Sequence, residues 1–144
     1  GRLTDAEFRE MKKHPEYGVE IMQPVKAFHT ILPAMLHHHE RYDGRGYPHG
    51  LAGEAIPLSA RILCVADCFD AMTSDRPYRK GMPVADAVSE LAKNKSTQFD
   101  PLLVDIFLNL VDRGKVEPVL AAYKNGGTDN VARQSVAESK AINH

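Results

Sequence analysis

The chain has 144 residues, 43% of them hydrophobic and 26% charged, which is typical of one globular domain or part of one. Its formal net charge of −1 argues against a general nucleic-acid-binding face, and its apolar runs are shorter than the ~20 residues that span a bilayer. The two cysteines, Cys64 and Cys68, fit buried thiols in a reducing compartment better than a disulfide. No signal peptide is visible and the chain begins with Gly1, so we expect a cytoplasmic protein and a processed or excised piece.

Helix start signals recur along the chain, and no alternating strand pattern competes with them. Thr4 and Glu7 form a capping-box pattern, and Asp100 precedes a first-turn proline. The expected helices are 4–14, 16–22, 30–41, 57–73, 83–93, 100–112 and a weaker one over 116–124. Residues 42–55, which include four glycines, indicate a loop. We predict an all-α bundle of about six to seven helices over residues 1–125, followed by a polar tail over 126–144.

The segment from His37 to Pro48 holds three consecutive histidines, a glutamate and a glycine-rich turn. On a helix over 30–41, the apolar stripe that contains Ile31 also contains His39, with His38 at its edge and His37 toward solvent. A single buried histidine is more often a hydrogen-bonded core residue than a ligand. Two adjacent inward histidines favour a metal role, and their adjacency suits two ions better than one.

The helix over 57–73 carries the next candidate, Asp67. Its predicted core face consists of Leu58, Ile62, Val65, Phe69 and Met72. Asp67 lies on a second face of small and apolar residues, so we expect it to be buried and to need a cation. That cation is either an arginine or lysine from elsewhere, or a metal shared with the histidines.

A basic cluster follows this helix, at Arg76, Arg79 and Lys80. Such a cluster is most often a solvated surface. Beside a metal site it could instead bind phosphate oxygens, to which arginine makes two-pronged contacts.

Three segments of the chain together resemble the HD-GYP family of bacterial phosphodiesterases: GRLTDAEFREMKKHPEYG, HHERYDGRGYPHGLAGEAIPLSARILCVADCFDAMTSDRPYRKG and FDPLLVDIF. The resemblance implies an all-helical, HD-superfamily-like fold. It also implies a hydrolase that cleaves the phosphodiester of cyclic di-GMP with a metal-activated hydroxide. The family commonly uses two divalent ions, expected to be iron or manganese, although zinc or nickel also suit histidine and carboxylate ligands.

The resemblance assigns roles position by position. The implied metal ligands are His14, His38, His39 and Asp67, of which His39 and Asp67 also count as catalytic. The implied substrate-binding residues are Gly46, Tyr47, Asp70, Arg76 and Arg79. His37 has no role in the family pattern.

The chain departs from the family in one respect, because it contains no His-Asp dipeptide. We therefore expect a domain that is incomplete at its N-terminus and weakly active or inactive alone. The alternative is a non-catalytic signalling module that binds a partner, such as a GGDEF or response-regulator domain. Hydrolysis of another nucleotide is a further alternative. Bared apolar surface would also favour a homodimer.

Overall fold

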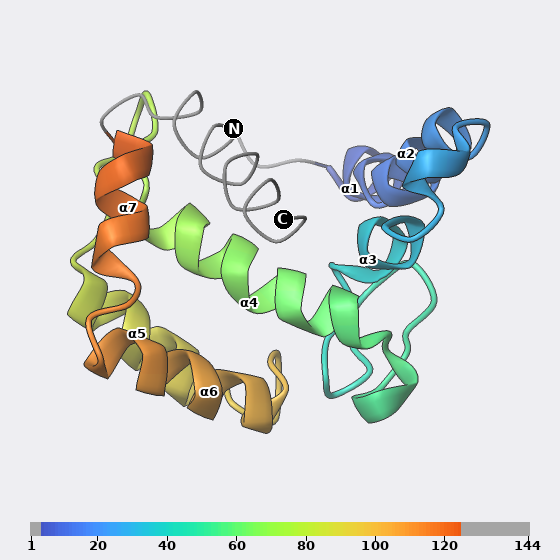
Figure 1. Ribbon diagram of the computed structural model, residues 1–144. Helices are drawn as coiled ribbons and strands as arrows, with labels where there is room; N and C mark the ends of the chain where they lie inside the picture. Colours follow the sequence, from blue (N-terminus) through green and yellow to red (C-terminus); the bar gives the residue numbers. More distant parts are fainter. Residues whose placement is uncertain (1–3, 125–144) are drawn as a thin grey trace, which may run out of the picture. The chain divides into compact units, whose positions relative to one another are not determined.

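The computed structural model describes residues 4–124, which form seven α-helices and two short 3₁₀ turns (Figure 1). The helices are α1 (Asp5–Met11), α2 (His14–Met22), α3 (Leu32–His37), α4 (Leu58–Thr73), α5 (Val84–Lys93), α6 (Pro101–Asp112) and α7 (Glu117–Lys124), and the 3₁₀ turns are Lys26–Phe28 and Gly53–Ala55. Residues 4–124 contain no β-strand, so the all-α prediction is confirmed. The predicted tail over 126–144 lies outside the described residues.

The longest helix, α4, contacts both α3 and α5, and α2 contacts α3 (Figure 1). The chain divides into two units between Asp105 and Ile106. Every residue of the candidate site described below belongs to the first unit. The fold of this unit is therefore what positions the site.

Local side-chain chemistry explains where several helices begin. The Thr4 side chain accepts a hydrogen bond from the backbone N–H of Glu7, whose carboxylate accepts one from the Thr4 N–H, so the predicted capping box is present. Asp100 caps α6 by accepting from the Leu102 N–H at 2.9 Å, and it also pairs with Arg61 of α4 at 2.5 Å. This buried ion pair joins the start of α6 to α4.

The core of the described chain includes residues from more than one face of α4. Its buried apolar residues are Ile56, Ala60, Cys64, Val65, Phe69, Ala87, Leu91, Phe99 and Val104. The prediction that Leu58 and Ile62 face the core is wrong, because their side chains are 55% and 50% exposed. Val65 and Phe69 of the predicted face are buried, and Ala60 and Cys64 are buried on another face of the helix.

The third helix is shorter than the sequence indicated. It begins at Leu32, two residues later than expected, after an N-cap at Ile31 that makes no side-chain hydrogen bond. It ends at His37, after which the N–H of Glu40 donates to the carbonyl of His37 in a turn. His38 and His39 therefore lie beyond the helix, and the helical phase does not set their directions.

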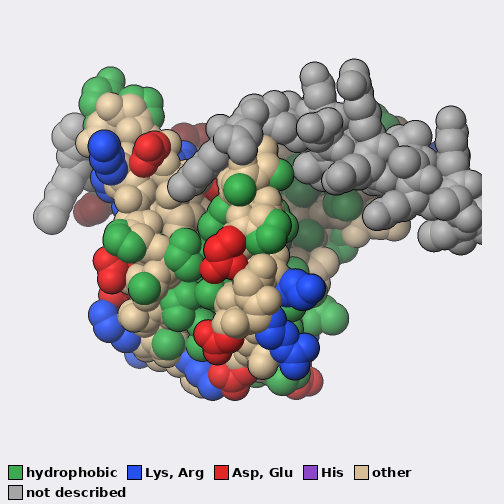
Figure 2. Space-filling model, turned by 60° about the vertical axis from the view of Figure 1, so that its left-hand side comes forward, with side chains coloured by type: hydrophobic (Ala, Val, Ile, Leu, Met, Phe, Trp, Pro, Cys, Tyr) green, Lys and Arg blue, Asp and Glu red, His purple; other side chains and the backbone are tan. Residues whose placement is uncertain are grey.

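The surface carries charges of both signs. Acidic and basic side chains are interspersed with hydrophobic ones on the face shown in Figure 2, in keeping with the small net charge. Over residues 4–124, every helix is too short or too polar to cross a membrane.

Candidate metal centre

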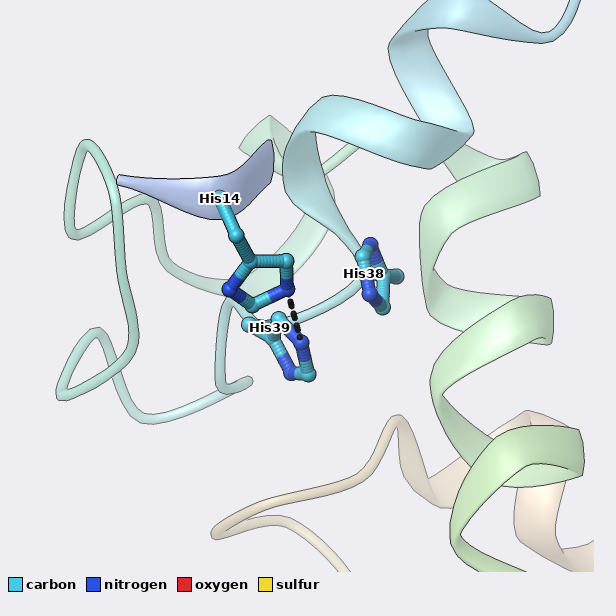
Figure 3. A group of neighbouring side chains, drawn as sticks. All are labelled: His14, His38 and His39. Carbon is cyan, nitrogen blue, oxygen red and sulfur yellow. Dashed lines mark hydrogen bonds between the residues drawn. The ribbon is translucent and has the colours of Figure 1, made fainter. Parts of the chain in front are cut away.

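Three histidines converge although one of them comes from a distant part of the sequence. His14 begins α2, whereas His38 and His39 follow the end of α3 (Figure 3). One ring nitrogen from each lies within 4.8 Å of the other two. The Nε2 atoms of His14 and His39 are 3.0 Å apart. The structure thus brings together the three histidines that the sequence singled out as ligands.

Hydrogen bonds to the backbone decide which nitrogen two of these rings present. Nδ1 of His14 donates to the carbonyl of Met11, and Nδ1 of His38 donates to the carbonyl of Met35, each at 2.7 Å. Because a carbonyl only accepts, Nδ1 is the donor in both bonds and each Nε2 is left with its lone pair, which in His14 already faces Nε2 of His39. A second nitrogen fixed in this way is the usual arrangement of a metal-binding histidine.

His39 is held from the other side by the glycine-rich loop. The Tyr47 ring stacks on the His39 ring with centroids 4.8 Å apart, and the Tyr47 N–H donates to the His39 carbonyl at 3.2 Å. Burial, together with repulsion from His38 and His14, lowers the pKa of His39 to about 4, although Asp67 opposes the shift. The ring is therefore neutral at pH 7, which is the form that binds metals.

The loop reaches this position because Gly46 passes very close to the chain at Glu40 and Arg41. A Cβ at Gly46 would lie 2.6 Å from the carbonyl carbon of Glu40 and closer still to the backbone nitrogen of Arg41. The Glu40 carboxylate, 2% exposed, accepts hydrogen bonds from the N–H groups of His49 and Leu51 at 2.7 and 3.1 Å. The glycine thus serves close packing of the loop on its own chain.

A cavity of about 390 Å³ opens beside His38 and His39. Its other lining residues are Phe8, Lys12, Glu40, Arg41, Arg45, Gly46, Tyr47, Cys64, Asp67, Cys68 and Gln98. The cavity therefore combines imidazoles, a carboxylate at Asp67 and three basic side chains.

Asp67 shares this cavity, but it is not buried as predicted. It is exposed in the structure, where it lines the cavity, although Ala60 and Cys64 on the same face of α4 are buried. No ion pair to Asp67 forms within residues 4–124, so an arginine or lysine partner is not found there. Asp67 instead interacts electrostatically with His39 across the cavity.

The three basic residues of the cavity were missed by the sequence analysis. Arg41 bonds to both carboxylate oxygens of Asp43 and to the side chain of Gln98, whereas Arg45 is exposed. The Lys12 ammonium lies 5.6 Å from the centre of the Tyr47 ring. These residues are scattered in the sequence, so no local run of charge marked them.

The basic cluster after α4 does not line the histidine cavity. Arg79 donates to the carbonyl of Ala71 and lines a neighbouring cavity of about 390 Å³ that also contains Cys68 and Gln98. The backbones of Arg76 and Arg79 bond to each other. Asp70 accepts from the Ser74 hydroxyl at 2.8 Å, on α4 outside the histidine cavity.

His37 does not point into solvent as the helical phase predicted. Its side chain is 14% exposed and turns toward Glu40 and His49, away from the other two histidines of the run. His37 is the last residue of α3, and the turn and loop that follow bring Glu40 and His49 against the side of the helix where solvent was predicted. Burial lowers the pKa of His37, as does the nearby His49.

The donor set fits a divalent transition metal. The three imidazole nitrogens suit zinc, iron or nickel. Asp67, whose carboxylate is the harder kind of ligand that manganese favours, lines the same cavity but is not among the ligand atoms that lie within 4.8 Å of one another. The contact between the Nε2 atoms of His14 and His39 marks where two ligand atoms already face each other.

Comparison with known proteins gives consistent results. The family model of the HD domain matches residues 1–103. The chain is 42% identical to the cyclic di-GMP phosphodiesterase response regulator RpfG of Xanthomonas campestris, over 85% of this chain and 32% of that protein. It is 40% identical to the 3′3′-cGAMP-specific phosphodiesterase 3 of Vibrio cholerae, over 70% of this chain and 22% of that protein.

The fold has a solved counterpart. The crystal structure of a cyclic GMP-AMP-specific phosphodiesterase of V. cholerae matches with a TM-score of 0.68 at 22% identity, over 94% of this chain and 30% of the other. The chain spans about a third or less of the length of the curated relatives named here. The family match over residues 1–103, the relatives' names and the shared fold agree with the resemblance seen in the sequence, and this chain belongs to the HD domain family.

Proposed function

We propose that this chain is the metal-binding part of a phosphodiesterase that hydrolyses cyclic di-GMP. The observation that carries the proposal is the convergence of His14, His38 and His39 beside a cavity that also contains Asp67. The names of the relatives supply the substrate class, because they include phosphodiesterases of cyclic di-GMP and of 3′3′-cGAMP.

His14, His38, His39 and Asp67 would hold a divalent ion. When bound, such an ion lowers the pKa of water and neutralises charge on a phosphate. The backbone carbonyls of Met11 and Met35 keep two of the imidazoles oriented for binding. Three imidazoles and one carboxylate suffice for one ion, whereas two ions would need further ligands, so we expect this chain alone to turn over substrate weakly.

The basic side chains around the cavity would bind the phosphates. Lys12 and Arg45 offer positive charge at the cavity wall, and Arg41 braces the wall through Asp43 and Gln98. Tyr47 and Gly46 would form the edge on which a base or ribose rests. Lys12, Arg41, Arg45, Gly46 and Tyr47 all line the cavity, which supports these roles.

The second cavity extends this site toward the other proposed substrate residues. It holds Arg79 and shares Cys68 and Gln98 with the histidine cavity. A cyclic dinucleotide has two phosphates, so one could lie at the histidines while the second approaches Arg79. Asp70 and Arg76 would act at the outer edge of this second position.

Hydrolysis after metal reconstitution tests the proposal. The chain loaded with manganese or iron should cleave cyclic di-GMP under single-turnover conditions, with 3′3′-cGAMP as the competing substrate. Loss of a metal ligand that also faces the substrate should lower the rate at least ~100-fold in His39→Ala and in Asp67→Ala. The matched control is His29→Ala, whose ring bonds to the Gln23 carbonyl away from the cavity.

Equal rates in wild type and His39→Ala would contradict the proposal. Metal binding without any turnover would instead favour the non-catalytic signalling module, whose partner could be a GGDEF or response-regulator domain. The predicted homodimer is tested by light scattering over a range of protein concentrations. The predicted cytoplasmic location is tested by fractionation of cells that express the protein.

A further inference from the structure

The first histidine of the run belongs to a second group of metal-ligating side chains. His37, at the end of α3, turns toward Glu40 in the following turn and toward His49 in the loop. One ligand atom from each residue lies within 4.8 Å of the other two. None of these residues is among the proposed ligands His14, His38, His39 and Asp67.

One nitrogen in this group has no hydrogen-bond partner. Nδ1 of His37 is a buried side-chain atom without a partner among the described residues. The nearest carboxylate oxygen, Oε1 of Glu40, is 3.8 Å away, too far for a hydrogen bond. A buried polar atom left unpaired is costly, so its presence calls for a missing water, ion or other ligand.

The carboxylate in this group is held in place but keeps free lone pairs. Oε1 of Glu40 accepts from the His49 N–H and Oε2 accepts from the Leu51 N–H. Each carboxylate oxygen has two lone pairs, so Oε1 can bind a further cation without losing either hydrogen bond. The same bond ties His49 to the group, because its backbone is fixed beside the carboxylate that its ring would join.

We propose that His37, Glu40 and His49 form a second metal site, selective for a zinc-like divalent ion. Two imidazoles and one carboxylate are a known zinc donor set, which leaves a fourth position for water. Ligands about 2.0 Å from a tetrahedral ion lie about 3.3 Å apart, so the 3.8 Å between His37 and Glu40 closes with a small side-chain movement. His49 is exposed and its ring can complete the set.

An ion at this position would add a link between two segments that already meet through Glu40, Gly46 and Tyr47. It would link the end of α3 to the loop that carries Tyr47, which stacks on His39. The site therefore has a structural role that does not depend on the proposed hydrolysis.

Zinc stoichiometry and affinity test this inference, with a chromophoric chelator as competitor. A His14→Ala/His38→Ala/His39→Ala variant removes the first cluster and should still bind one zinc per chain. Adding His49→Ala should weaken that zinc more than ~100-fold, since even loss of an outer-shell partner costs 10- to 100-fold. Adding His29→Ala, a nearby histidine outside the group, should leave the affinity unchanged.

The inference is overturned if the triple variant binds no zinc, or if His49→Ala and His29→Ala weaken binding equally. Should the triple variant not fold, the same comparison is made in the otherwise unaltered chain, where His49→Ala alone should lower the stoichiometry by one zinc. An unchanged stoichiometry there would also reject the site. Loss of turnover in His39→Ala is a separate readout, so the two proposals fail independently.

Discussion

The two histidine clusters contain adjacent residues, His38 and His37, yet they differ in the segments that they join and in the side chains that surround them. His38 and His39 turn toward His14, from a distant segment, and line an open cavity with basic side chains. His37 instead faces a buried carboxylate and a histidine within the same thirteen-residue stretch, 37–49. The comparison shows that adjacent histidines at a helix end can face two different sets of neighbours.

Substitution of Gly46 should cause the largest loss of stability. In Gly46→Ala the added Cβ would meet backbone atoms of Glu40 and Arg41, which cannot rotate away. We therefore expect the free energy of unfolding to fall by about 3 kcal/mol or more. Urea unfolding measures it. Gly18→Ala is the control, since its Cβ would make only an ordinary 3.5 Å contact, with Met35, and a helical alanine is neutral or stabilising. Equal effects of the two substitutions would contradict the close packing described here.

Removal of bound metal should cause the next largest loss of stability, and each cluster should account for its own part of that loss. An ion at 100 times its dissociation constant stabilises the folded state by about 2.7 kcal/mol, so a chelator should lower stability by that amount for each occupied site. His39→Ala should abolish the contribution of the first cluster alone, and His49→Ala that of the second alone. Thermal unfolding with and without chelator measures both. A single substitution that removes the whole metal effect would mean that the clusters are one site.

Glu40→Gln should lower the stability of the protein by an intermediate amount, and Glu40 belongs to the second cluster. The amide has one acceptor oxygen, so either the His49 or the Leu51 N–H loses its partner, at a cost of about 2 kcal/mol. Urea unfolding of the metal-free protein measures it, with the exposed Glu54→Gln as control. If Glu40→Gln is as stable as Glu54→Gln, the carboxylate does not hold the loop.

The smallest predicted effect is the pH dependence of His39. Its pKa is about 4 in the folded state, below the usual value of 6.5. Between these values the unfolded chain binds a proton that the folded chain does not, so stability falls as the pH falls from 6.5 toward 4. Solvent screening of this half-buried ring limits the effect to about 1 kcal/mol or less. Metal-free wild type should lose more stability between pH 7 and 5 than His39→Ala; parallel losses would exclude this origin.

The sequence predicted most of the helices because their start signals are local. The capping box at Thr4 and the cap at Asp100 act within three residues, so they are visible without tertiary structure. The prediction of three ligand histidines also agrees with their convergence. It came from the motif resemblance and from residue type, whereas the helical phase behind part of it was wrong once α3 ended at His37.

What escaped prediction depends on contacts between segments. Whether Asp67, Leu58 and Ile62 are covered is decided by the elements packed on α4, and no pattern within the helix reveals that. The binding of loop N–H groups by Glu40 joins residues nine and eleven positions apart. The steric need for Gly46 likewise appears only when the loop closes on its own chain.

The hydrogen bonds from His14 and His38 to carbonyls three residues earlier make these ligands robust to mutation in a specific sense. The acceptor in each pair is a main-chain oxygen, so replacing the side chain of Met11 or Met35 leaves it in place. A backbone segment of four residues therefore decides which nitrogen each of these two rings presents. Substitutions of cavity side chains can therefore change the lining without changing which nitrogen these two rings present.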